Sequence, residues 1–226
     1  MTTSPPGLMR RGLLLFGAAA LLLGVLFFGT AGTFDYWQAW VYLAILLIPM
    51  LAVLLYFLRR DPALLERRFQ AREQEQRQQG IVNCGVVIML LAYLIPGLSQ
   101  RFGWPTVRPA ISIAADVVVL LAYGMFFLVL RENSYAARTV AVESGQQVVT
   151  TGPYRYVRHP MYLALSLLYV LSPLALGSAW AVLPALFLVV VLVVRIRDEE
   201  RVLFEGLPGY SEYQQKTRYR LIPGVW

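Results

Sequence analysis

Long uncharged runs constrain this 226-residue chain more than any other feature of its sequence. Residues 12–34, 36–58 and 81–100 contain no charged side chain, and residues 110–130 contain only Asp116. A helix needs about 20 consecutive apolar residues to cross a bilayer. The sequence therefore predicts four membrane spans within residues 1–131.

A fifth run, residues 161–194, is uncharged over 34 positions and is too long for a single span. Pro173, Gly177 and Pro184 interrupt it, and these residue types commonly end helices or form turns. We expect two short helices, at about 161–176 and 178–194, folded back as a hairpin. The predicted fold is an all-α, polytopic membrane helical bundle of five to six spans, which forms one domain over residues 1–226.

The composition agrees with a membrane protein. Hydrophobic residues make up 58% of the chain and charged residues only 15%, whereas a soluble domain carries about 25% charged residues. The net charge of +7 is better explained by membrane topology and anionic lipid than by nucleic acid. Cys84 and His159 are the only residues of their types, so no intrachain disulfide, multi-histidine metal site or cysteine-rich metal site is expected.

The basic residues predict the orientation. Two precede the first run, six separate the second and third, four lie between the fourth run and the hairpin, and six follow the hairpin. The opposite side receives only Arg101 and Arg108. Because cytoplasmic loops are enriched in Lys and Arg, this split of 18 to 2 predicts that both termini and the segment before the hairpin face the cytoplasm. In a bacterium, the membrane would be the inner membrane.

One polar segment directly precedes the hairpin. Gly152-Pro153 predicts a turn, and Pro160 suits the first position of the following helix. Arg158, His159 and Tyr162 would then lie where water meets that helix. Tyr and Arg are also common as simple interface anchors, so this segment alone leaves a binding site and an anchor equally open.

A second polar segment follows the hairpin. Arg195 and Glu199 are four residues apart and share one helical face, and Glu200 points elsewhere. In isolation this is an ordinary pair on a solvated helix end. A hairpin brings its two ends together, however, so we expect Arg195 and Glu199 to face the segment from Tyr154 to Tyr162. The two segments would form one cytoplasmic pocket.

Other sites have weaker support. Asp116 is either an intramembrane functional group or a side chain that reaches water near the outer interface. The sequence contains no G-x-G-x-x-G, no G-x-x-x-x-G-K-[ST] and no G-x-S-x-G pattern. Neither a Rossmann nucleotide site, a P-loop nor a nucleophile elbow is therefore indicated.

The two polar segments carry a family resemblance. Residues 152–162 read Gly-Pro-Tyr-Arg-Tyr-Val-Arg-His-Pro-Met-Tyr, and the pair Glu199-Glu200 follows after the hairpin. With Leu203, Tyr210, Tyr213 and the tetrapeptide that begins at Arg220, they resemble the isoprenylcysteine carboxyl methyltransferase family. Phospholipid methyltransferases are similar in the same region. The resemblance covers about residues 140–226, and the first four spans match only in hydropathy.

The resemblance implies an integral membrane methyltransferase that uses S-adenosylmethionine without a Rossmann domain. Carried over by position, the cofactor would be held by Gln146, Gln147, Val148, Val149, Tyr154, His159, Pro160, Met161, Tyr162 and Glu199. Arg195 matches the position that binds the substrate and would orient a carboxylate acceptor. Glu200, or His159, could instead assist an ammonium acceptor to lose its proton. Residues 140–226 would be the catalytic region.

The expected acceptor is amphiphilic and lipid-like, because its tail can enter sideways between the spans; a prenylcysteine-like carboxylate is one candidate. Membrane lipids are expected partners, and nucleic acid and metal are not. Three alternatives stay open at this point: a phospholipid N-methyltransferase, an NADPH-dependent membrane reductase of a lipid double bond, and a non-catalytic membrane scaffold.

Overall fold

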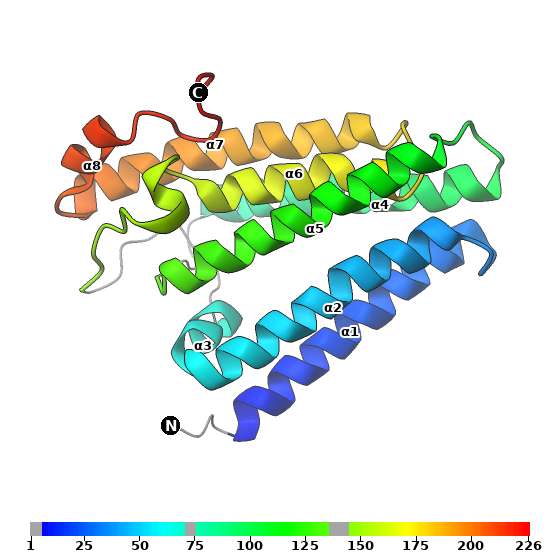
Figure 1. The fold of residues 1–226 in the computed structure, drawn as a ribbon, viewed down its shortest axis with the longest axis horizontal. Helices are drawn as coiled ribbons and strands as arrows, with labels where there is room; N and C mark the ends of the chain where they lie inside the picture. The colour runs from blue at the N-terminus through cyan, green and yellow to red at the C-terminus, as the bar shows by residue number, and fades with distance from the viewer. Residues whose placement is uncertain (1–5, 71–75, 136–144) are drawn as a thin grey trace.

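The computed structural model describes residues 6–70, 76–135 and 145–226, and these form a helical bundle (Figure 1). The predicted catalytic region began at residue 140, so its first five residues lie outside the described ranges. In chain order the elements are α1 (Pro6–Ala31), α2 (Trp37–Arg60), α3 (Pro62–Gln70), α4 (Gln76–Arg101), α5 (Pro109–Glu132), the 3-10 helix η1 (Gly152–Arg155), α6 (Pro160–Ala175), α7 (Val182–Gly206) and α8 (Tyr210–Lys216).

Four of these helices are long and apolar enough to cross a membrane. They correspond to Gly7–Ala31, Trp37–Arg60, Gln79–Arg101 and Pro109–Glu132, and each covers all or most of one of the four predicted runs. Large apolar side chains such as Leu21 and Ile48 are about 70% exposed on the bundle surface, as lipid-facing residues are. The all-α, polytopic membrane bundle predicted from the sequence is thus confirmed.

The hairpin of α6 and α7 differs from its predicted boundaries. Its first helix ends at Ala175, one residue from the expected position, but the second begins at Val182 rather than at residue 178 and continues to Gly206. Gly177 adopts a φ of +83°, which a glycine tolerates best, and the neighbouring Ser178 pairs with Thr106. This pairing keeps residues 176–181 in the turn. The longer α7 carries Arg195, Glu199 and Glu200 on a regular helix.

Hydrogen bonds from other helices anchor the tip of the hairpin. The last carbonyl groups of an α-helix have no partner within the helix. Tyr36 donates its hydroxyl to the carbonyl of Leu176 at 2.6 Å, and Ser112 donates to the carbonyl of Leu174 at 2.9 Å. The carboxyl end of α6 is therefore satisfied inside the bundle by side chains of α5 and of the residue before α2.

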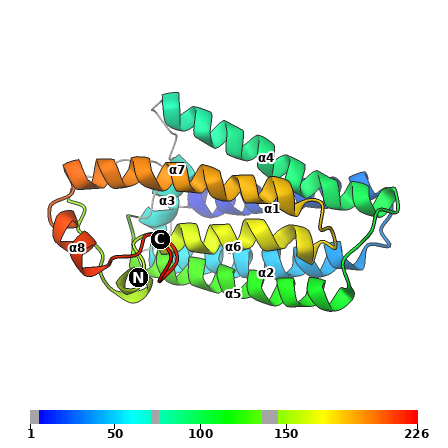
Figure 2. The same ribbon diagram turned by 90° about the horizontal axis from the view of Figure 1, so that it is seen from above.

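The helices are close at one end of the bundle and spread at the other (Figures 1 and 2). At the spread end, α1 and α2 diverge from α5, and α4 diverges from α7. This end also carries α3, η1, α8 and the carboxy-terminal segment, and we refer to it as the α8 end. Asp61 caps α3 there, because its carboxylate accepts a hydrogen bond from the backbone N–H of Leu64 at 3.0 Å.

Candidate functional site: a polar cavity at the α8 end

The backbone before α6 pairs with the carboxy-terminal segment. Arg158 N–H donates to the carbonyl of Tyr219, and His159 N–H donates to the carbonyl of Arg220, both at 2.9 Å. Pro160 then begins α6, where its missing N–H costs no helical hydrogen bond. This pairing fixes the start of α6 against a segment about 60 residues later in the chain.

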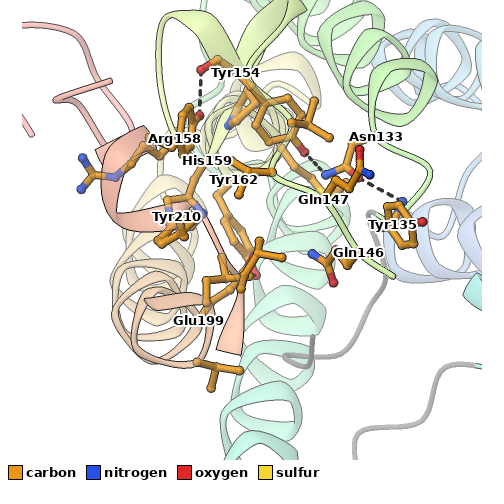
Figure 3. Close-up of a pocket in the computed structure, with 18 of the residues that line it drawn as sticks. Asn133, Tyr135, Gln146, Gln147, Tyr154, Arg158, His159, Tyr162, Glu199 and Tyr210 are labelled. Carbon is orange, nitrogen blue, oxygen red and sulfur yellow. Dashed lines mark hydrogen bonds between the residues drawn. The ribbon is translucent and has the colours of Figure 1, made fainter. Parts of the chain in front are cut away.

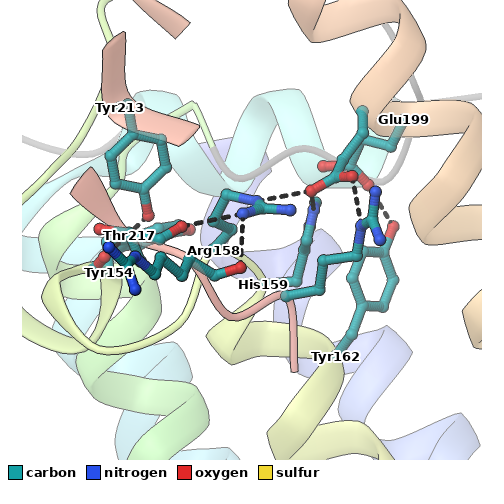
Figure 4. Close-up of polar contacts among 10 residues, drawn as sticks. Tyr154, Arg158, His159, Tyr162, Glu199, Tyr213 and Thr217 are labelled. Carbon is teal, nitrogen blue, oxygen red and sulfur yellow. Dashed lines mark hydrogen bonds and ion pairs between the residues drawn. The ribbon is translucent and has the colours of Figure 1, made fainter. Parts of the chain in front are cut away.

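Three parts of the chain meet around Arg158 and His159, which Figure 4 labels, and the carboxylate of Glu200 joins them. Arg158 Nε donates to Oε1 at 2.7 Å, and His159 Nε2 lies 3.3 Å from the same oxygen. Arg220 Nε donates to Oε2 at 2.6 Å. Arg158 also donates through Nη1 to the carbonyls of Thr217 and Arg218, each at 2.9 Å. One side chain of α7 thus links the start of α6 to the carboxy-terminal segment.

The electrostatics of Glu200 follow from these contacts. Burial alone would raise the pKa of its carboxyl, but hydrogen bonds from His159, Arg158 and Arg220 outweigh burial and hold the pKa at about 2. Glu200 is therefore ionised at neutral pH. A carboxylate with so low a pKa is a weak proton acceptor, since an effective general base has a pKa nearer the working pH.

A second contact chain connects Arg195, Tyr162 and Glu199. The Tyr162 hydroxyl donates to Glu199 Oε2 at 2.5 Å and accepts a hydrogen bond from Arg195 Nε at 3.1 Å. Tyr162 is in the first turn of α6, whereas the other two residues are one turn apart on α7. The hairpin thus brings its two ends together as the sequence predicted, and the tyrosine hydroxyl is the contact between them.

These residues surround a cavity that contains about 870 Å³ of empty space, including space open to solvent (Figure 3). All ten residues that the sequence assigned to a cofactor line the cavity, as does Arg195: Gln146, Gln147, Val148, Val149, Tyr154, His159, Pro160, Met161, Tyr162, Arg195 and Glu199. Glu200 is not among its lining residues.

Tyr154 is held on the side of the cavity that faces α5. Its hydroxyl accepts a hydrogen bond from Asn133 Nδ2 at 2.9 Å, and its backbone carbonyl accepts one from the Tyr213 hydroxyl at 2.7 Å. Burial raises the pKa of the Tyr154 phenol, which therefore stays neutral at pH 7. Gly152 has a φ of +57° and permits the turn that precedes Tyr154. A Cβ atom at position 152 would lie 3.0 Å from the side chain of Glu132.

A largely apolar groove adjoins the cavity. We call it the α4–α7 groove; it contains about 1,470 Å³ of empty space between α4, α6 and α7, with Arg68 and Phe126 contributed by α3 and α5. Met161, Tyr162 and Arg195 line both the groove and the polar cavity. An apolar chain in the groove would therefore place its polar head at Arg195.

Residues 113–205, from α5 through most of α7, match the model of the isoprenylcysteine carboxyl methyltransferase family. Over this region, which is less than half of the chain, the sequence is similar to the isoprenylcysteine carboxyl methyltransferase family. The matched region contains the α6–α7 hairpin except for its last residue, and it includes Tyr162, Arg195 and Glu199. The family resemblance predicted from the sequence is therefore confirmed over these residues.

A curated relative matches a similar length of sequence. The cobalt-zinc-cadmium resistance protein CzcN of Cupriavidus metallidurans is 32% identical over 137 residues, which is 58% of this chain and 58% of that protein. The chain thus matches less than two thirds of the relative's length. The name of CzcN refers to metal resistance and specifies no reaction.

Eight further lining residues were not part of the cofactor assignment, and Asn133, Tyr135, Tyr210 and Tyr213 are among them. Tyr210 and Tyr213 belonged to the quoted resemblance, and their spacing of three places both on one face of α8. Asn133 had no such signal. It follows the end of α5, at a distance in sequence from either polar segment, and only the tertiary fold brings it to Tyr154.

Proposed function

We propose that the chain is an S-adenosylmethionine-dependent methyltransferase that methylates a carboxylate on an amphiphilic, lipid-like acceptor. One observation carries the proposal: Arg195 lies where a polar cavity lined by all ten assigned cofactor residues meets an apolar groove. A polar cofactor and an apolar-tailed acceptor can approach each other only at such a junction.

The lining of the cavity suits the chemistry of S-adenosylmethionine. The cofactor carries a cationic sulfonium and an ammonium group, and Glu199 supplies a carboxylate within the cavity wall. Gln146 and Gln147 supply amide groups, and Val148 and Leu203 supply apolar surface for the less polar parts of the molecule. When bound, the cofactor supplies a methyl group on a sulfonium that is neutralised as the methyl group leaves.

Arg195 has the main role toward the acceptor. Its guanidinium can hold a carboxylate by two parallel hydrogen bonds. The Nε of Arg195 donates a hydrogen bond to the Tyr162 hydroxyl, and this contact fixes the orientation of the guanidinium. A carboxylate is already ionised at pH 7, so no proton has to move. In the transfer, the carboxylate oxygen forms the new O–C bond, the C–S bond breaks, and its electron pair stays on sulfur. The protein contributes alignment and electrostatic stabilisation.

We assign to Glu200 a positioning role. Its carboxylate is engaged by three cationic or potentially cationic side chains and lies outside the cavity wall. By fixing Arg158 and His159, it fixes the first turn of α6 and hence Tyr162. This geometry does not support the proton-accepting role that the sequence suggested for Glu200.

The alternatives fit the cavity less well. An N-methyltransferase acting on an ammonium headgroup would place that cation beside Arg195, and like charges repel at short range. A reductase would need cationic side chains for the 2′-phosphate of NADPH, and the described lining offers only Arg158, Arg195 and His159 among basic residues. A scaffold would not require a junction between cavity and groove.

The orientation with the α8 end in the cytoplasm belongs to the same proposal. Single cysteines in a Cys84→Ser background test it, with Gly103→Cys in the loop after α4 and Gln147→Cys in the cavity wall. An impermeant thiol reagent added to intact cells should label position 103. Labelling of position 147 instead would reverse the orientation.

The reaction itself is tested by transfer of labelled methyl from S-adenosylmethionine to total lipid and protein extracts. Membranes containing the protein should yield a labelled, lipid-soluble methyl ester, from which mild base releases the label as methanol. Membranes with the Glu199→Gln variant provide the control. A base-stable product would indicate N-methylation instead. If the protein binds the cofactor but transfers no methyl group to either extract, the proposed class of acceptor is wrong.

A further inference from the structure

Within the α4–α7 groove, the two helices approach each other closely at one position. A Cβ atom added to Gly85 of α4 would lie 3.7 Å from Cγ1 of Val191 on α7, which is an ordinary van der Waals contact. Both residues line the groove. From this position toward the α8 end, α4 diverges from α7 (Figure 2). The approach of Gly85 to Val191 therefore marks where the opening between the two helices begins.

The groove follows one face of α7 on both sides of this position. Four of its lining residues lie on that helix: Leu188, Val191, Leu192 and Arg195. Their spacing of three and four residues places them on one helical face. With a rise of about 1.5 Å per residue, Val191 is about 6 Å from Arg195 along the helix axis, and Leu188 is about 10 Å away. A tail that follows this face from a carboxylate at Arg195 passes Gly85 after about 6 Å.

Gly85 differs from the other glycines of α4. At Gly97, a Cβ atom would overlap the side chain of Thr30, so the close packing of α4 against α1 requires a glycine there. At Gly80, a Cβ atom would have no neighbour within 4 Å. At Gly85, a methyl group would fit against Val191, so helix packing alone does not require a glycine. The consequence of the missing side chain at position 85 is the space that it leaves in the groove.

We infer that Gly85 is a specificity-determining residue, which lets the groove admit acceptor tails longer than about five carbon atoms. The inference rests on the proposed function, because it requires the carboxylate of the acceptor to be held at Arg195. A saturated chain advances by about 1.3 Å per carbon, since its C–C bonds are about 1.5 Å long. The fifth carbon of the acceptor therefore lies level with Gly85, and a larger side chain at this position would occupy the space of the carbons that follow.

Unbranched fatty acids of graded length test the inference, with the full-length protein in nanodiscs. Pentanoate ends near Gly85, whereas dodecanoate extends well past it. In Gly85→Leu, kcat/KM for dodecanoate should fall by about tenfold or more, because an overpacked groove excludes the tail, and kcat/KM for pentanoate should stay within about twofold of wild type. Each comparison is made between variant and wild type on the same probe, so that partitioning of the probe into the bilayer cancels.

Two further variants separate the groove from the fold. Gly80→Leu adds the same side chain at an exposed position of the same helix, where no atom lies within 4 Å, and should change neither probe. Gly85→Ala adds one methyl group in ordinary contact with Val191, so it should fold as wild type and lower kcat/KM for dodecanoate less than Gly85→Leu does. Equal losses for the two probes in the variants of Gly85, or no loss for either probe, would overturn the inference.

Cofactor binding distinguishes this inference from the proposed function. Because Gly85 is not among the residues that line the polar cavity, Gly85→Leu should bind S-adenosylmethionine with the affinity of wild type in calorimetric titration. If the wild-type protein binds the cofactor but methylates none of the fatty acids, the inference on the tail is wrong. If the folded wild-type protein does not bind the cofactor, the proposed function itself is wrong.

Discussion

Two buried carboxylates distinguish the membrane-spanning bundle from the site at the α8 end. Asp116 in α5 is 2% exposed, and neither of its oxygens has a hydrogen-bond partner within the described part of the chain. Glu200 in α7 is 6% exposed and is contacted by Arg158, His159 and Arg220. The carboxyl group of Asp116 in the spans therefore has no described hydrogen-bond partner. The carboxylate of Glu200 at the α8 end belongs to a network of charged side chains.

The contrast shows where specific geometry is concentrated. The spans bury apolar side chains that can be exchanged for others of similar volume at modest cost. The charges at the α8 end must each keep a partner, because a buried charge without one is strongly destabilising. Substitutions should therefore have unequal effects in the two regions.

The largest effect is expected for Glu200→Leu. It leaves Arg158 buried without its carboxylate, and breaking a buried pair in this way costs about 3–5 kcal/mol. Thermal unfolding in detergent should detect this loss. Glu205→Leu is the control, since Glu205 is exposed on the same helix and should change stability by about 0.5 kcal/mol or less. Similar stability of the two variants would contradict the positioning role of Glu200.

Glu199→Gln should weaken the cofactor site without unfolding it. Loss of a charged hydrogen bond in a shielded site costs about 1.5–3 kcal/mol, which corresponds to roughly 10- to 150-fold in S-adenosylmethionine affinity. Calorimetric titration measures the affinity, and Glu212→Gln on the exposed face of α8 is the control. Wild-type affinity in Glu199→Gln would remove this residue from the cofactor site.

Arg195→Lys separates the acceptor from the cofactor. Lysine keeps the positive charge but lacks the planar fork that orients a carboxylate, so turnover should fall by about tenfold or more while cofactor affinity is retained. Both quantities have to be measured on the same preparation. Arg197→Lys, at an exposed position two residues away, should behave as wild type. Normal turnover in Arg195→Lys would limit Arg195 to a structural contact with Tyr162.

The smallest effect is expected for Asp116→Asn. Because Asp116 makes no hydrogen bond in the described structure, removal of its charge should leave methyl transfer unchanged and should not lower stability by more than about 0.5 kcal/mol. Asp35→Asn, at an exposed position, serves as the control. Loss of activity in Asp116→Asn alone would show that the spans also contain a functional group.

The sequence predicted the two regions unequally well, for a physical reason. The spans follow from uncharged runs, because length and hydropathy suffice to specify a helix in lipid. The cavity could be predicted because a hairpin must bring Tyr162 and Glu199 together. The position of Asn133 beside Tyr154 could not be predicted, since it depends on how α5 packs against α6. The contacts of Glu200 with Arg158, His159 and Arg220 were equally inaccessible, because they depend on how the carboxy-terminal segment packs against the start of α6.

Calorimetry on the purified, detergent-solubilised protein tests the central claim most directly. S-adenosylmethionine, S-adenosylhomocysteine and NADPH are titrated in turn into wild type and into His159→Ala, whose imidazole lines the cavity. The account predicts that the first two bind the wild-type protein, that NADPH does not, and that His159→Ala weakens both. A folded wild-type protein that binds NADPH, or that binds neither S-adenosylmethionine nor S-adenosylhomocysteine, would contradict it.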